Sequence, residues 1–276
     1  MSDFGPVVSA TWLAEHLGEA DLAVVDCRWY LDGRSGRDAY ETAHIPSAVW
    51  ADIDADLSAP ASVEGGRHPL PDPFDFAASM SRLGIGDTTR VVAYDDVGGV
   101  ISGRLWWMLD VLGHDAAILD GGISAWDGPL ATSAAQPAPA AFAVTAWPAD
   151  RIMTKAEMRD AIGSDLTMLD ARSADRYANG GPVDPRPGHI PGASSAPATD
   201  NLAGGQLRSP EDLAAHYNEI GAGSGDVVAY CGSGVSACID LLAMRRAGLP
   251  DGKLYVGSWS AWGADESLPN EVGTSD

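Results

Sequence analysis

The sequence predicts an α/β protein of two similar domains, each a parallel sheet with helices on both faces. Two observations lead to this prediction. A set of motifs occurs twice in the same order, and short β-branched runs alternate with helical patterns. The chain has 276 residues, which is enough for two ordinary domains, and its apolar fraction of 45% can supply a core to each.

Four pairs of similar segments carry the repeat. An Asp-x-Arg strand end, a His-Ile-Pro turn, a Val-Val-Ala-Tyr strand and a Gly-rich ending each occur once in either half. The pairs are 23–28 with 167–172, 44–48 with 189–193, 91–95 with 227–231, and 121–126 with 257–262. Four matches in one order indicate a duplicated domain.

The duplication sets the expected domain boundaries. Residues 131–150 are rich in Pro and Ala and are predicted to form an extended linker. The first domain is therefore expected over 1–130 and the second over 151–276.

The second copy alternates helical and strand patterns. Ser209 followed by Pro210 is a good helix start, and Gly248 is a good helix end. Helices are expected at 155–162, 209–218 and 237–247, and strands at 166–170, 226–230 and 253–256. In parallel sheets, functional sites lie at the carboxyl ends of strands. Cys231 stands at such an end, directly before a helix.

The composition excludes several classes of function. A formal charge of −22 repels nucleic acid and anionic lipid, so neither is expected as a partner, and an anionic substrate would need a local cationic pocket. No apolar run is long enough to span a bilayer, and the first residues carry no secretory pattern. A cytoplasmic protein is expected.

The cysteines are few and lack metal-binding spacing. Cys27, Cys231 and Cys238 form an odd set without a Cys-x2-Cys pair, which argues against both a disulfide framework and a structural zinc site. We expect no metal and no cofactor. Cys27 and Cys238 are expected to be buried structural thiols, although a redox role for either stays open.

The cysteine loop, residues 231–237, reads Cys-Gly-Ser-Gly-Val-Ser-Ala. Two glycines allow several backbone N–H groups to turn inward and form an anion-binding nest, to which the following helix adds partial positive charge. Both effects favour the Cys231 thiolate, the nucleophilic form. The alternative is a buried cysteine before an ordinary strand-to-helix turn.

The first copy differs at the same point. Asp95 takes the place of the cysteine and is followed by Asp96. We expect two carboxylates to spoil an anion nest, so that this copy acts as a scaffold.

Taken together, these motifs resemble the tandem-domain rhodanese family, and most closely its 3-mercaptopyruvate sulfurtransferases. The resemblance covers nearly the whole chain and implies two rhodanese-like domains, with an inactive first copy and a persulfide carried on Cys231. The family's loop has Thr where this chain has Ser236. Thiosulfate-preferring relatives carry Arg-Lys where this chain has Gly232 and Ser233. The implied contacts of the bound sulfur are Gly232, Gly234, Val235 and Ser236.

The resemblance also implies substrate-side residues. Arg176 and Arg186 would bind the donor carboxylate, a task suited to the planar guanidinium, although surface ion pairs are the alternative for either one. Ser233, His68 and Asp54 would form a relay that protonates the leaving group. The loop before His68 differs from the family's, so a solvated loop histidine is the alternative there.

Two other functions fit the sequence less well. A cysteine phosphatase needs Cys-x5-Arg, and Ala237 stands where that arginine would be. A rhodanese-like binding module would leave the thiol and the arginines unexplained. The expected reaction moves sulfur from a small-molecule donor, 3-mercaptopyruvate or alternatively thiosulfate, to cyanide or a thiol acceptor such as thioredoxin.

Overall fold

The computed structural model describes residues 4–274, and its chain forms two compact units. The first unit contains Met1–Ala59, Pro71–Trp147 and Gly204–Leu207. The second contains Pro60–Leu70, Pro148–Ala203 and Arg208–Asp276. The segment Pro60–Leu70, which carries His68, therefore packs with the second copy of the repeat although it precedes most of the first.

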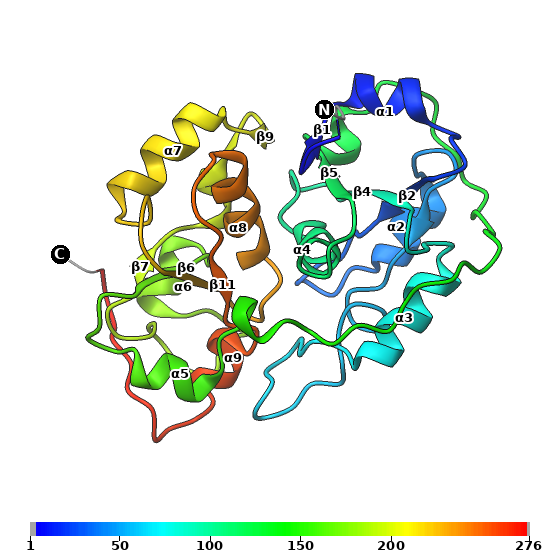
Figure 1. Ribbon diagram of the computed structural model, residues 1–276. Helices are drawn as coiled ribbons and strands as arrows, with labels where there is room; N and C mark the ends of the chain where they lie inside the picture. Colours follow the sequence, from blue (N-terminus) through cyan, green and yellow to red (C-terminus); the bar gives the residue numbers. More distant parts are fainter. Residues whose placement is uncertain (1–3, 275–276) are drawn as a thin grey trace. The chain divides into compact units, whose positions relative to one another are not determined.

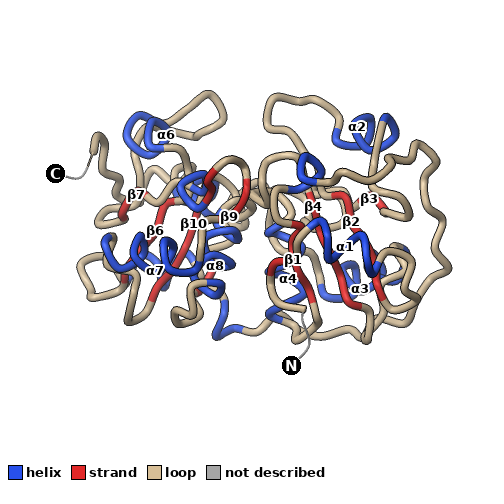
Figure 2. The backbone as a smooth tube through the Cα atoms, turned by 90° about the horizontal axis from the view of Figure 1, so that it is seen from above, coloured by secondary structure: helices blue, strands red, loops and turns tan. Residues whose placement is uncertain are grey.

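The first unit is built on a five-stranded parallel sheet with the order β1-β5-β4-β2-β3. Its strands are β1 (Val7–Val8), β2 (Leu22–Asp26), β3 (Val49–Trp50), β4 (Arg90–Tyr94) and β5 (Ala116–Leu119). Its helices are α1 (Ala10–His16), α2 (Gly36–Thr42), α3 (Pro73–Arg82), α4 (Gly103–Val111) and the 3-10 turn η1 (Gly122–Ala125). Figures 1 and 2 show the strands of this unit side by side.

The second unit is built on a four-stranded parallel sheet with the order β11-β10-β6-β7. Its strands are β6 (Thr167–Asp170), β7 (Ser194–Ser195), β10 (Val227–Tyr230) and β11 (Lys253–Leu254). Its helices are η2 (Ala149–Arg151), α5 (Lys155–Asp160), α6 (Ala174–Asn179), η3 (Ala198–Asn201), α7 (Pro210–Glu219), α8 (Ala237–Arg246) and α9 (Ser258–Trp262). The short strand β8 (Leu202–Ala203) also belongs to this unit, whereas β9 (Gln206–Leu207), after a Gly-Gly turn, belongs to the first.

Helices cover both faces of each sheet, which confirms the predicted α/β class. In the second unit, Met168 and Tyr230 pack on one face with Trp259 of α9, while α8 packs against β10 and β11. In the first unit, Val92 packs with Leu13 of α1, while α4 packs against β4 and β5. Because successive strand residues point to opposite faces, strands covered on both sides are apolar throughout.

The predicted elements of the second copy are confirmed, with ends that differ by a few residues. Ser209 begins α7 as expected, and its Oγ accepts a hydrogen bond of 3.1 Å from the Asp212 N–H. Strand β11 is shorter than predicted and ends at Leu254. Within the described residues, no helix is long and apolar enough to cross a lipid bilayer.

The repeated Asp-x-Arg and His-Ile-Pro motifs hold equivalent parts of the two folds. In the second unit, the Arg172 guanidinium binds both Asp170 oxygens and donates to the Gly188 carbonyl at 2.8 Å. His189 stacks on Tyr177 with ring centres 3.7 Å apart. The first unit repeats both contacts with its own Asp, Arg, Tyr and His. These motifs therefore tie the strand end to the next turn in both copies.

Candidate active site

Cys231 lies where strand β10 meets the loop that leads into α8. It is buried, with 1% of its surface exposed. Its thiol sulfur accepts a hydrogen bond of 3.1 Å from the Gly234 N–H. Its backbone is fixed on both sides, because its N–H donates to Ser258 Oγ at 3.1 Å and its carbonyl accepts from the Trp259 N–H at 2.9 Å. The cysteine loop therefore folds around the sulfur, as the two glycines predict.

The loop favours the ionised thiol. Burial raises the pKa of Cys231, but hydrogen bonds from the Ser236 hydroxyl and from the backbone of Ser233, Ala237 and Gly234 outweigh it, so this pKa lies below the ordinary value of 9.0. A persulfide anion at the same position would meet the same donors.

The two loop glycines serve different needs. Gly234 has φ +78°, and a β-carbon there would lie 2.5 Å from the Val256 carbonyl oxygen, so only glycine fits. A β-carbon at Gly232 would lie 2.9 Å from Arg176 Nη2 and 3.0 Å from Arg67 Nη2. Gly232 thus leaves space over the loop into which two guanidinium groups point.

Ser233 and His68 meet beside the sulfur. His68 Nδ1 lies 2.8 Å from Ser233 Oγ, and both residues are buried, with 3% and 5% exposed. The loop that carries His68 is anchored to the second unit, since the Arg67 N–H donates to Ser260 Oγ at 3.0 Å. The structure therefore brings together two members of the expected relay.

Arg176 lies at the loop and is also ion-paired. Its Nε and Nη2 donate to the two oxygens of the buried Asp184 at 2.9 and 2.6 Å. This ion pair is largely buried, unlike the surface ion pair named as the alternative, and the guanidinium that it holds lies next to Gly232. A planar group held from one edge can still offer N–H groups on its other edge to an anion.

Arg67 was not among the residues expected from the sequence. Its Nη1 donates to the Val183 carbonyl at 2.7 Å, while its Nε is buried and has no partner among the described residues. Burial and the neighbouring Arg176 lower the pKa of Arg67, and the Cys231 thiolate raises it. Two neighbouring guanidinium groups repel each other, so their position over the loop favours an anionic ligand. The position of Arg67 next to His68 was the available signal.

Arg186 contacts the site through a tryptophan. Its Nη2 donates to the Leu268 carbonyl at 2.8 Å, and its guanidinium carbon lies 5.8 Å from the Trp259 ring centre. The backbone N–H of Trp259 in turn donates to the Cys231 carbonyl. These contacts differ from the direct clamp expected of Arg186, whose part in binding a donor stays a prediction.

Asp54, the third expected member of the relay, belongs to the first unit. Its Oδ2 accepts a hydrogen bond of 2.9 Å from Trp29 Nε1, and its N–H donates to Asp52 Oδ1 at 2.9 Å. Its role in the relay also stays a prediction.

Comparison with known proteins places this arrangement in a family. The model of the rhodanese-like domain matches residues 9–128 and 154–265. The chain belongs to the tandem-domain rhodanese family. A probable 3-mercaptopyruvate sulfurtransferase of Pseudomonas aeruginosa is 40% identical over 97% of this chain and 98% of that protein. The human 3-mercaptopyruvate sulfurtransferase is 38% identical over 93% and 91%. The crystal structure of SseA, a 3-mercaptopyruvate sulfotransferase of Escherichia coli, has a TM-score of 0.79 and 32% identity, covering 92% of this chain and 99% of its own.

The first rhodanese copy forms a nest that is already filled. Asp95 Oδ1 accepts the N–H groups of Val97 and Gly99, both at 2.9 Å, and Oδ2 accepts those of Ile101 and Ser102 at 2.7 and 2.8 Å. The expectation that carboxylates would spoil the nest was therefore wrong. The loop keeps its anion-binding shape, and its own carboxylate takes the position of the sulfur.

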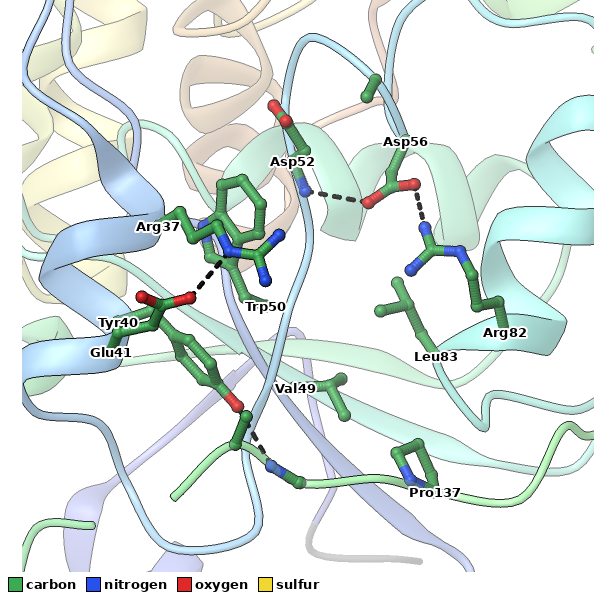
Figure 3. A pocket seen from close by; sticks show the side chains of 13 residues that line it. Arg37, Tyr40, Glu41, Val49, Trp50, Asp52, Asp56, Arg82, Leu83 and Pro137 are labelled. Atoms are coloured by element: carbon green, nitrogen blue, oxygen red, sulfur yellow. Dashed lines mark hydrogen bonds and ion pairs between the residues drawn. The ribbon is translucent and has the colours of Figure 1, made fainter. Parts of the chain in front are cut away.

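The first unit also holds a cavity of about 360 Å³, shown in Figure 3. Arg37 pairs with Glu41 on one side of it, and Arg82 pairs with Asp56 on the other. The guanidinium carbon of Arg37 lies 5.9 Å from the centre of the Trp50 ring. Both arginines that line this cavity are bound to carboxylates of the same cavity.

The other two cysteines are buried and form no disulfide within the described part of the chain. Burial and the nearby carboxylates of Asp26, Asp95 and Asp56 raise the pKa of Cys27 well above its ordinary value. The environment of Cys27 therefore disfavours a thiolate. Cys238 donates its thiol to the Gly234 carbonyl at 3.5 Å.

Proposed function

We propose that this chain is a 3-mercaptopyruvate sulfurtransferase in which Cys231 carries the sulfur atom as a persulfide. The observation that carries the proposal is the cysteine loop, where a thiol of lowered pKa lies beside a Ser233–His68 pair and under two guanidinium groups. The names of the relatives that match nearly the full chain support the same donor.

The facing arginines favour a carboxylate donor. Arg67 and Arg176 converge over Gly232, and the unpartnered Nε of Arg67 leaves a buried donor for an incoming anion. Charge-assisted hydrogen bonds to a carboxylate are the strongest that such groups form. In a chain of net charge −22, this local pair also supplies the attraction that an anionic substrate needs.

The proposed chemistry has two displacement steps. In the first, the Cys231 thiolate attacks the sulfur of 3-mercaptopyruvate; an S–S bond forms, the C–S bond breaks, and its electron pair leaves as the enolate of pyruvate. The enolate carbon takes up a proton and pyruvate departs. In the second step an acceptor thiolate attacks the outer sulfur, and Cys231 leaves as the thiolate.

Ser233 and His68 would supply the proton to the enolate. A hydroxyl hydrogen-bonded to a histidine can pass a proton to carbon and be reprotonated from the ring. Asp54 would complete the relay by orienting His68. The acceptor would be a small thiol, cyanide or a protein such as thioredoxin, in the cytoplasm.

Replacing His68 with asparagine should lower the activity with 3-mercaptopyruvate far more than the activity with thiosulfate. We expect kcat/KM for 3-mercaptopyruvate to fall by about 100-fold, because the enolate loses its proton source. Thiosulfate releases sulfite, which leaves without protonation, so its turnover should change by less than about threefold.

The measurement is kcat/KM for both donors on wild type and on His68→Asn, with cyanide as acceptor. The wild type should prefer mercaptopyruvate by at least about tenfold. A preference for thiosulfate would establish the thiosulfate enzyme instead, and absence of thiocyanate with either donor would point to a binding module. Equal losses on both donors would remove His68 from the relay.

Replacing Arg67 with methionine should weaken the use of mercaptopyruvate. We expect kcat/KM to fall by about 10- to 100-fold, since one charge-assisted hydrogen bond to the carboxylate is lost. Arg159→Met is the matched control, because Arg159 is an exposed arginine on α5 paired with Asp160. If both variants change kcat/KM equally, the effect belongs to net charge and not to the site.

A further inference from the structure

Ser258 holds an unusual backbone conformation next to Cys231. Its φ is +52°, in a left-handed region that residues other than glycine rarely adopt. It is fully buried. Its Oγ accepts the Cys231 N–H at 3.1 Å and donates to the Tyr255 carbonyl at 3.0 Å. The hydroxyl therefore links the backbone of the cysteine to the end of β11.

The first copy has Asp95 in place of the cysteine and a glycine in place of Ser258. Gly122 is the equivalent residue in the repeat, and its φ of +59° is nearly the same. A β-carbon there would lie 2.2 Å from the Asp95 carbonyl oxygen, so that copy requires glycine. The next contact is the same in both copies, because Ile123 N–H binds the Asp95 carbonyl and Trp259 N–H binds that of Cys231, both at 2.9 Å. Only the copy with the thiol carries a side chain in the strained conformation.

From this contrast we infer that Ser258 is a positioning residue for the nucleophile. Its hydroxyl fixes the Cys231 backbone so that the sulfur lies within the N–H nest, and the strained backbone is retained for that bond. Without it the buried Cys231 N–H would lose its partner and the sulfur would move from the Gly234 N–H. The inference rests on the proposed function only in naming Cys231 as nucleophile.

Two substitutions distinguish the effect of the Ser258 hydroxyl from the effect of its strained backbone. Ser258→Ala removes the hydroxyl and keeps a β-carbon at positive φ, whereas Ser258→Gly removes both and introduces the residue of the first copy. Both should slow the alkylation of Cys231 by iodoacetamide at pH 7 by about fivefold, the effect of one hydrogen bond. The rates should converge with wild type at high pH, where the thiol is ionised in every variant. Ser258→Gly should unfold at higher urea than Ser258→Ala, because glycine relieves the strain.

The readout is alkylation of the peptide that contains Cys231, followed by mass spectrometry over a range of pH, with the exposed Ser267→Ala as control. Unchanged rates at pH 7, or a loss equal at every pH, would overturn the positioning role. If Ser258→Gly is no more stable than Ser258→Ala, the claim that the backbone is strained at this position is contradicted. Because alkylation needs no sulfur donor, the test stands even if 3-mercaptopyruvate proves not to be the substrate.

Discussion

Cys231→Ser should abolish sulfur transfer from every donor, with a loss of at least about 10⁴-fold in kcat. A serine hydroxyl cannot form the S–S bond of the persulfide. The matched control is Cys238→Ser, which should keep most of its activity, since a hydroxyl can also donate to the Gly234 carbonyl. After incubation with donor alone, mass spectrometry should find one added sulfur on the Cys231 peptide of wild type. Transfer that survives in Cys231→Ser would contradict the whole mechanism.

The pH dependence of the same thiol supplies a second readout. Because its pKa lies below 9.0, alkylation and kcat/KM should fall as the pH drops through that lowered pKa. The contribution of this thiol to the free energy of unfolding should also fall as the pH drops. An acid whose pKa is depressed by folding contributes stability that is full above its unfolded pKa and lost as the pH falls through the folded pKa. A midpoint at or above 9.0 would mean that the loop does not stabilise the thiolate.

The fold was largely predictable because its signals are local. The repeat, the apolar strands and the Ser209 cap lie in short stretches of sequence, and the structure confirms them. The cysteine loop was predictable for the same reason, since Gly234 and the start of α8 are its neighbours in the chain.

The rest of the site depends on contacts between distant parts of the chain. Arg67 and Ser233 are far apart in sequence, and nothing local indicates that the segment Pro60–Leu70 packs with the second copy. In the sequence, nothing distinguishes Ser258 from the other small residues of the repeated segment 257–262. Its role depends on a positive φ and on a bond to Cys231 that the sequence alone does not reveal. The expectation for Asp95 was wrong because it considered only the charge of the carboxylate and not its position inside the nest.

Asp95→Asn should destabilise the first unit by about 3 kcal/mol. The carboxylate is fully buried and accepts four backbone N–H groups, two on each oxygen. An asparagine has the same shape, but its NH₂ group would face two of these donors and leave them without a partner. Because the donors precede α4, as the cysteine loop precedes α8, the loss should also loosen the start of that helix.

Asp96→Asn is the matched control for this change. Asp96 is only partly buried and accepts one hydrogen bond of 2.7 Å from the Tyr30 hydroxyl, so its replacement should cost less than about 1 kcal/mol. Urea unfolding of the three proteins gives the comparison, and alkylation of Cys231 at pH 7 should stay at the wild-type rate in both variants. Equal destabilisation by the two substitutions would contradict the filled nest. A larger loss for Asp95 would mean that the first copy keeps its loop folded with a carboxylate where the second copy uses a thiolate.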